Sequence, residues 1–259
     1  MSSRLTSQGP STPSQHLPLL TVLVLTLLSP ATRAHDLWIE RTGGAYTLYN
    51  GHKHSGHGGH GNHEGQSGHD GDRVIPYGPA FVTQALCFDT QGQVKHEAKG
   101  GSPFRLEGEC AALTIAVSSG YWSKTPKGTL NVPKDEARQV VKSWLSREWV
   151  KRLDAWSPAL AKPLTPGLEL ISLEDPLHLA QGDKLRLQLT RDRQPVAGAT
   201  VTYDGEPRGR TDEEGRINLR IQHGGYQMIA AGITRPRPSP QADEEVLTTA
   251  LVFELPPNR

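Results

Sequence analysis

Residues 51–70 interrupt the chain with a run of histidine, glycine and small polar residues that contains no apolar side chain. A segment with nothing apolar to bury cannot be part of a core, so we expect a long loop between elements that do have a core. Six of the protein's eleven histidines lie in this run, and near pH 7 their imidazoles are mostly neutral nitrogen ligands that suit Zn, Ni, Cu or Co. They are His52, His54, His57, His60, His63 and His69.

Short β strands are predicted on both sides of this loop. Residues 37–40 and 45–49 are rich in apolar, aromatic and β-branched side chains, and the Thr-Gly-Gly sequence at 42–44 between them is typical of a turn. Further candidate strands follow at 80–88, 103–106 and 110–117. Abundant proline and glycine with few aromatic residues favours a β-rich chain. We therefore expect an N-terminal β domain at 35–165, with the histidine-rich loop (51–72) inserted in it.

One helix is predicted, at residues 134–155. Pro133 suits a helix start, and Asp135 and Glu136 would lie at the positive end of the helix dipole. Val141, Leu145, Trp149 and Leu153 recur every four residues and predict an apolar stripe that packs on a sheet. The segment 160–167, which contains two prolines, is interpreted as a linker.

A second β domain is predicted at residues 166–259. Its candidate strands are separated by turns rich in Gly, Pro and Asp, a spacing typical of a small β-sandwich. The predicted fold class is therefore mainly β, with two β-sandwich domains of immunoglobulin-like or transthyretin-like type and one amphipathic helix between them. The candidate strands are 168–173, 184–189, 199–203, 217–221, 226–231 and 246–255.

Residues 1–34 have the features of a secretory signal peptide. A short apolar run at 17–28 precedes small residues at 32 and 34, which suits cleavage after Ala34. The alternative, a retained anchor, is disfavoured because the run is shorter than the ~20 residues that span a bilayer. No later segment has that composition, so we expect a mature protein without a membrane span, located in the periplasm or secreted. His35 would then be the first residue, and its α-amino group and imidazole could chelate one metal ion.

Charge and cysteine content narrow the function further. Without the two arginines of residues 1–34, 26 basic residues face 27 acidic residues, so no basic surface for nucleic acid is predicted. Cys87 and Cys110 are the only cysteines and lie in strand-like runs. In an oxidising compartment they would form a disulfide; the alternative is two buried thiols.

Sequence motifs add two resemblances. Residues 194–199 (QPVAGA), 211–216 (TDEEGR) and 224–226 (GGY) are similar to the carboxypeptidase-regulatory or transthyretin-like β-sandwich. The mature chain as a whole resembles an exported domain-of-unknown-function family associated with nickel and cobalt uptake, labelled nickel uptake substrate-specific. That resemblance implies a periplasmic metal-binding accessory that works with membrane transporter components. It is carried by residues 34–38, 51–52, 167–170, 175–176 and 182–183.

The candidate metal ligands fall into two groups. His35, His52 and His54 are predicted to form an ordered site, because alternate residues of a strand share a face. His57, His60, His63 and His69 are separated mainly by glycine, so ordering them costs chain entropy and they would bind more weakly. The predicted cargo is Ni²⁺ or Co²⁺, with Cu²⁺ or Zn²⁺ as the alternative.

Three other interpretations stay open. The tract can be a solvated spacer, or the second domain can be a docking module. The chain can also be a copper monooxygenase in which His35 supplies half of a histidine brace. A non-enzymatic function is favoured, because the sequence contains no recognisable nucleophile–base arrangement, phosphate loop or carboxylate pair.

Overall fold

The structure, a computed structural model, describes residues 36–53 and 72–256. In these residues the chain forms seventeen β strands and two short 3-10 helices, η1 (Pro79–Phe81) and η2 (Lys134–Glu136). The predicted mainly β class is therefore confirmed. The predicted helix at residues 134–155 does not form. Twelve of its last sixteen residues, 140–155, lie in one of these strands, as described below.

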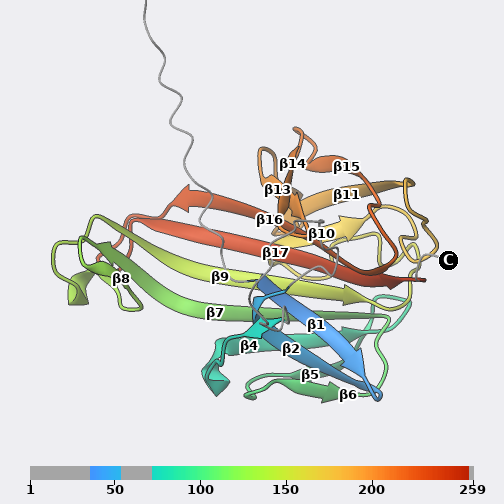
Figure 1. Cartoon of the computed structure of the whole chain (residues 1–259), viewed down its shortest axis with the longest axis horizontal. Helices are drawn as coiled ribbons and strands as arrows, with labels where there is room; N and C mark the ends of the chain where they lie inside the picture. The colour runs from blue at the N-terminus through green and yellow to red at the C-terminus, as the bar shows by residue number, and fades with distance from the viewer. Residues whose placement is uncertain (1–35, 54–71, 257–259) are drawn as a thin grey trace, which may run out of the picture. The chain divides into compact units, whose positions relative to one another are not determined.

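Most of the strands belong to one central sheet, which combines both halves of the chain (Figure 1). β9 and β17 lie next to each other and run parallel, although the predicted domain boundary at residue 165 separates them in sequence. The sheet therefore crosses that boundary. In spatial order it contains β14 (Glu206–Arg210), β13 (Thr200–Tyr203), β16 (Gly225–Pro236), β17 (Glu244–Leu255), β9 (Lys142–Leu153), β7 (Ala112–Thr125), β4 (Val82–Phe88) and β5 (Val94–Ala98), with β8 (Gly128–Leu130) paired to β7.

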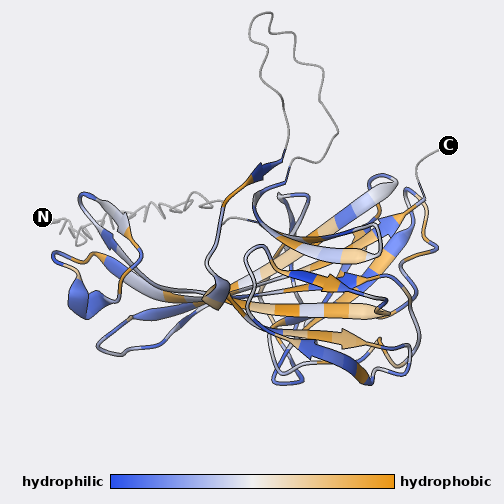
Figure 2. Ribbon diagram, turned by 90° about the horizontal axis from the view of Figure 1, so that it is seen from below, coloured by the Kyte–Doolittle hydropathy of each residue, from blue (hydrophilic) through white to orange (hydrophobic). Residues whose placement is uncertain are grey.

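A small N-terminal sheet covers one face of the central sheet. Side chains alternate along β7, so Leu113, Ile115 and Val117 share one face and pack in one core cluster with Ile39 and Leu48 of the small sheet. Figure 2 shows these covered parts of the strands as the more hydrophobic ones. The N-terminal sheet consists of β1 (Asp36–Thr42), β2 (Ala45–His52), β3 (Arg73–Val74) and β6 (Arg105–Glu107).

A C-terminal sheet covers the opposite face. Leu185, Leu187 and Leu189 of β11 are fully buried against Leu251 and Phe253 of β17 in a second core cluster. The central strands are thus buried on both sides, while their ends on the side of β8 extend past the flanking sheets and are more hydrophilic (Figure 2). The C-terminal sheet consists of β10 (Glu169–Ser172), β11 (Lys184–Arg191), β12 (Gln194–Pro195) and β15 (Arg216–Arg220).

The predicted helix at residues 134–155 is wrong. The structure has a single 3-10 turn at Lys134–Glu136, and most of the remaining segment is the long strand β9. Val141, which was expected on the apolar stripe, is 71% exposed. The capping residues therefore mark a short turn before a strand.

The error has a physical reason in the spacing of the apolar residues. Leu145, Trp149 and Leu153 lie four residues apart, and four is a multiple of the two-residue period of a strand as well as close to one helical turn. These three side chains therefore share one face of β9. Because β9 is covered on both sides for part of its length, it also lacks the clean alternation that identifies a half-exposed strand.

The two cysteines form a disulfide, as predicted. Cys87 lies on β4 and Cys110 just before β7, and both are buried in the cluster under the N-terminal sheet. The bond closes an interval of 23 residues that contains β5 and β6.

Removing this disulfide should destabilise the protein. For a closed loop of this length the loss of chain entropy in the unfolded state corresponds to about 3 kcal/mol. We expect the free energy of unfolding of the double variant Cys87→Ser/Cys110→Ser to be lower than that of the wild type by that amount. Urea unfolding, monitored by circular dichroism, measures the difference. A reductant should destabilise the wild type and leave the double variant unchanged; equal responses of the two proteins would contradict the prediction.

Candidate functional site

The first hairpin brings the start of β1 next to the histidine tract. β1 and β2 pair from Thr42↔Ala45 at the turn to Asp36↔Gly51 at the open end. Gly43 and Gly44 both have positive φ angles in the two-residue turn, as hairpin turns of this kind require. Asp36 therefore lies opposite the residue that precedes His52.

Glycine is required at position 51. Gly51 has φ +152°, and a Cβ atom there would lie 1.9 Å from the carbonyl oxygen of Arg73. The absence of a side chain allows β3 to pair with the end of β2, where His52 is opposite Arg73. The two ends of the histidine tract are thus neighbours in the N-terminal sheet.

Lys53 connects the two ends of the tract to the core. Its Nζ atom donates to Glu40 Oε1 at 2.7 Å and to Asp72 Oδ2 at 3.1 Å, and its side chain is only 15% exposed. The ammonium also lies 5.3 Å from the ring centre of Trp38 and 4.6 Å from that of Tyr226. These cation–π contacts and ion pairs hold residue 72 beside β1.

β1 itself is fixed to the central sheet by polar contacts. The carbonyl oxygen of Ile39 accepts hydrogen bonds from Arg152 Nη1 at 3.2 Å and from Tyr226 Oη at 3.0 Å. Because buried backbone carbonyls need a partner, these two side chains stabilise β1 in its position. The first hairpin is therefore held in a fixed position on the central sheet.

Two carboxylates lie near the start of β1. Glu148 is on the face of β9 that is turned toward the N-terminal sheet, and burial raises its pKa to about 7. Hydrogen bonds with Ser146 and Thr248 lower the pKa of Glu148, and the negative charge of Asp36 raises it further. Glu148 is not among the predicted site residues, because in the predicted helix it was an ordinary polar residue.

The described residues include one of the predicted metal ligands. His52 ends β2 and is partly buried. His35, His54, His57, His60, His63 and His69 lie outside the described residues. Within 36–53 and 72–256, no three or more histidine, cysteine, aspartate or glutamate side chains are arranged to hold a metal ion.

The three isolated histidines have separate surroundings. His96 is exposed on β5, and His178 is exposed with Nδ1 2.9 Å from Asp175 Oδ2. His223 is buried, with Nε2 2.7 Å from Asp204 Oδ2 and Nδ1 2.7 Å from the carbonyl oxygen of Gly224. In the described part of the chain none of them joins a ligand cluster.

The fold and these contacts define a mainly β protein with a reinforced hairpin end, from which a histidine-rich segment of the sequence continues. The chain belongs to DUF4198, a family described as a domain of unknown function, whose model matches residues 32–235. No curated protein and no solved structure matches the chain. In the part of the chain that the structure describes, no helix has the length and apolar character needed to cross a membrane.

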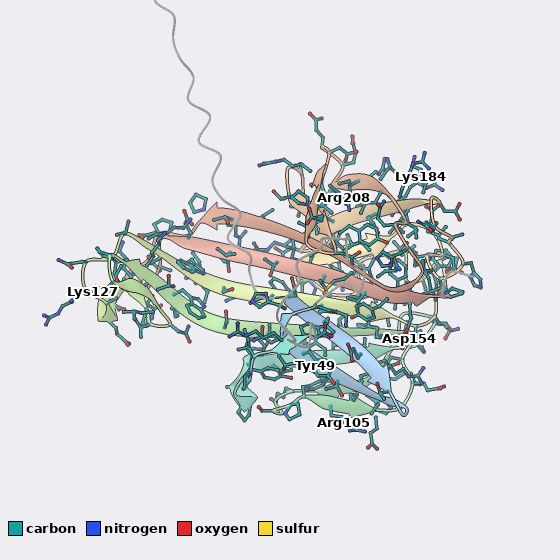
Figure 3. The ribbon with its side chains drawn as sticks, viewed as in Figure 1. Tyr49, Arg105, Lys127, Asp154, Lys184 and Arg208 are labelled. Atoms are coloured by element: carbon teal, nitrogen blue, oxygen red, sulfur yellow. A yellow bond between two sulfur atoms is a disulfide. The ribbon has the colours of Figure 1, made fainter. Side chains whose placement is uncertain are left out.

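Lys53 should contribute measurably to stability. Lys53→Met keeps an apolar stem but leaves the partly buried carboxylates of Glu40 and Asp72 without their cation, which should cost about 2 kcal/mol. Lys127→Met is the matched control, because Lys127 is exposed at the β7–β8 end (Figure 3). Urea unfolding of both variants measures the difference, and equal stabilities would show that the Lys53 contacts contribute nothing.

His223 should make stability depend on pH. Burial lowers its pKa, but hydrogen bonds with Asp204 and Gly224 raise it more, so the net pKa lies above the ordinary value of about 6.5. Its stabilising contribution is therefore complete below about pH 6.5 and is lost as the pH rises through the higher folded-state pKa.

The stability difference between the wild type and His223→Gln should thus be larger near pH 6 than near pH 8.5. Thermal unfolding at both pH values measures it. His96→Gln, which removes an exposed histidine on β5, is the matched control. A larger effect of His223→Gln at the higher pH would contradict the assignment.

Proposed function

We propose that this protein is an exported metal-binding protein that captures Ni²⁺ or Co²⁺ in the periplasm and passes it to a membrane uptake system. The observation that carries the proposal is the register of the first hairpin, in which Asp36 pairs with Gly51. Asp36, the residue that follows the predicted mature N-terminus, is thus paired with Gly51, the first residue of the histidine tract.

The proposed site depends on cleavage after Ala34. His35 would then provide an α-amino group and an imidazole, and it is covalently joined to Asp36, opposite the residue before His52. Amine and imidazole nitrogens are borderline ligands that suit late first-row divalent ions. We propose His35, His52 and His54 as the principal ligands.

The remaining histidines would serve as a second set with lower affinity. His57, His60, His63 and His69 are close in sequence to the proposed site, and Lys53 and Asp72 tie the flanking residues to the N-terminal sheet. Such a tract raises the local concentration of ligands near the principal site. The carboxylate of Asp36 adds negative charge beside the hairpin end, which favours the approach of a divalent cation. Glu148, whose pKa is raised to about 7, is only partly ionised near neutral pH and adds to this charge as the pH rises.

The C-terminal part of the chain is proposed to act in docking. The motifs at 194–199, 211–216 and 224–226 resemble transthyretin-like domains, and they lie in or beside β12, β13, β15 and β16. Metal delivery needs a membrane partner, and we propose that this region contacts it.

Isothermal titration of the untagged mature protein, beginning at His35, tests the metal site. We expect saturable binding of Ni²⁺ or Co²⁺ near pH 7 that weakens below about pH 6, because imidazoles must lose a proton to coordinate. His52→Ala should lower the affinity about tenfold or more.

Two controls separate this site from incidental binding. His96→Ala removes an exposed histidine on β5, at the end of the central sheet order, and should leave the affinity unchanged. A protein with one methionine added before His35 keeps all imidazoles but displaces the free amine, so it should bind more weakly. Absence of Ni²⁺ and Co²⁺ binding would overturn the proposal.

Copper binding is the main alternative outcome. Most nitrogen-ligand sites bind Cu²⁺ more tightly than Ni²⁺, so affinity alone does not assign the physiological metal. Metal content of the protein isolated from its native periplasm decides between nickel or cobalt uptake and copper or zinc buffering. Peroxide formation by the copper-loaded protein with a reductant would instead favour a monooxygenase.

A further inference from the structure

A second candidate site lies on the face of the central sheet that is opposite the N-terminal sheet. A cavity of about 220 Å³ opens where the C-terminal sheet stops covering β9. It is smaller than the pockets of about 300–1,000 Å³ that hold drug-sized ligands, so a small molecule would fill it. Its lining includes Gln84, Thr114, Arg147, Trp149, Gly167 and Arg191.

One wall of the cavity is held by a buried ion pair. Lys151 Nζ donates to Glu169 Oε1 at 2.8 Å, and both side chains are only 3% exposed. The other oxygen of Glu169 accepts hydrogen bonds from the backbone amides of Leu164 and Thr165 and from the Thr165 hydroxyl. The segment at 164–167 is therefore fixed against the central sheet.

Trp149 provides an apolar surface in the same cavity. Gly167 lies directly against its indole, since a Cβ atom at that position would be 2.3 Å from Trp149 Nε1. The cavity is also lined by Ala116 and Pro166. One side of the cavity thus suits a carbon skeleton.

Two arginines on the cavity wall have unused hydrogen-bonding capacity. Glu245, whose side chain is 3% exposed, accepts two hydrogen bonds from Arg235, at 2.8 and 2.7 Å. Arg147 and Arg191 each approach the same carboxylate only to 3.7 Å, which is too long for a hydrogen bond. Among the described residues, Arg191 Nη1 is buried without any hydrogen-bond partner.

The local charge is positive. Arg147, Arg191 and Arg235 face two carboxylates, those of Glu245 and Asp192. Burial lowers the pKa of Arg191, and the neighbouring Arg235 lowers it further, although Glu245 and Asp192 act in the opposite direction. A bound anion would supply both the missing acceptor and the missing negative charge.

We propose that this cavity binds a small carboxylate, with Arg191 and Arg147 as its cationic anchors and the carbon skeleton against Trp149. The planar guanidinium fork matches a carboxylate in geometry, and carboxylate–arginine hydrogen bonds are among the strong ones in proteins. Inorganic phosphate has the same charge chemistry but no apolar part, so the Trp149 wall favours the organic anion.

Titration with sodium succinate tests this proposal on the full mature protein. We expect a saturable rise in melting temperature that sodium chloride at equal ionic strength does not produce. Arg191→Gln and, separately, Arg147→Gln should each weaken succinate binding about tenfold or more. Arg147 is half-exposed, so its variant remains informative if Arg191→Gln fails to fold.

Arg105→Gln is the matched control. Arg105 is exposed on β6, in the sheet that covers the other face (Figure 3), and its loss should leave succinate binding unchanged. Saturable binding of phosphate without succinate would overturn the carboxylate assignment. Unchanged succinate binding in both arginine variants, or no saturable effect of either anion, would overturn the site. The nickel titration is independent, because His52 belongs to the N-terminal sheet, which covers the opposite face.

Discussion

Burial of the central sheet on both faces is the constraint on which the rest of the structure depends. Each of its long strands must supply two sets of apolar side chains, one for each flanking sheet. Leu113 and Ile115 of β7 face the N-terminal sheet, while Leu251 and Phe253 of β17 face the C-terminal one. Because β9 and β17 pair in the middle of this sheet, neither half of the chain can complete its core without the other.

The two candidate sites lie where the flanking sheets stop covering the central sheet. Arg147 and Glu148 are adjacent on β9 but point to opposite faces, since side chains alternate along a strand. Glu148 lies toward the hairpin end, with its pKa raised by burial, and Arg147 lines the cavity on the other side. One strand thus contributes to both candidate sites, and the disulfide and the Lys53 contacts reinforce the same hairpin side.

Much of the strand pattern could be predicted, and the candidate sites only in part. The turn at residues 42–44, the Cys87–Cys110 pair and the strands of the C-terminal half follow from local signals. The helix at 134–155 failed because a four-residue apolar spacing fits a strand as well as a helix. Arg191 and Glu245 could not be connected from sequence, because their meeting depends on strands 54 residues apart in the chain.

The sequence by itself determined where strands and turns form and where the histidine tract must leave the core, because those properties depend on the side chains of a few neighbouring residues. Only the tertiary structure decided that β9 pairs in parallel with β17 and that the open end of the first hairpin lies beside Glu148. It also decided that three arginines surround one buried carboxylate. Pairing between distant strands is chosen by the burial of both faces together, and no local pattern records that choice.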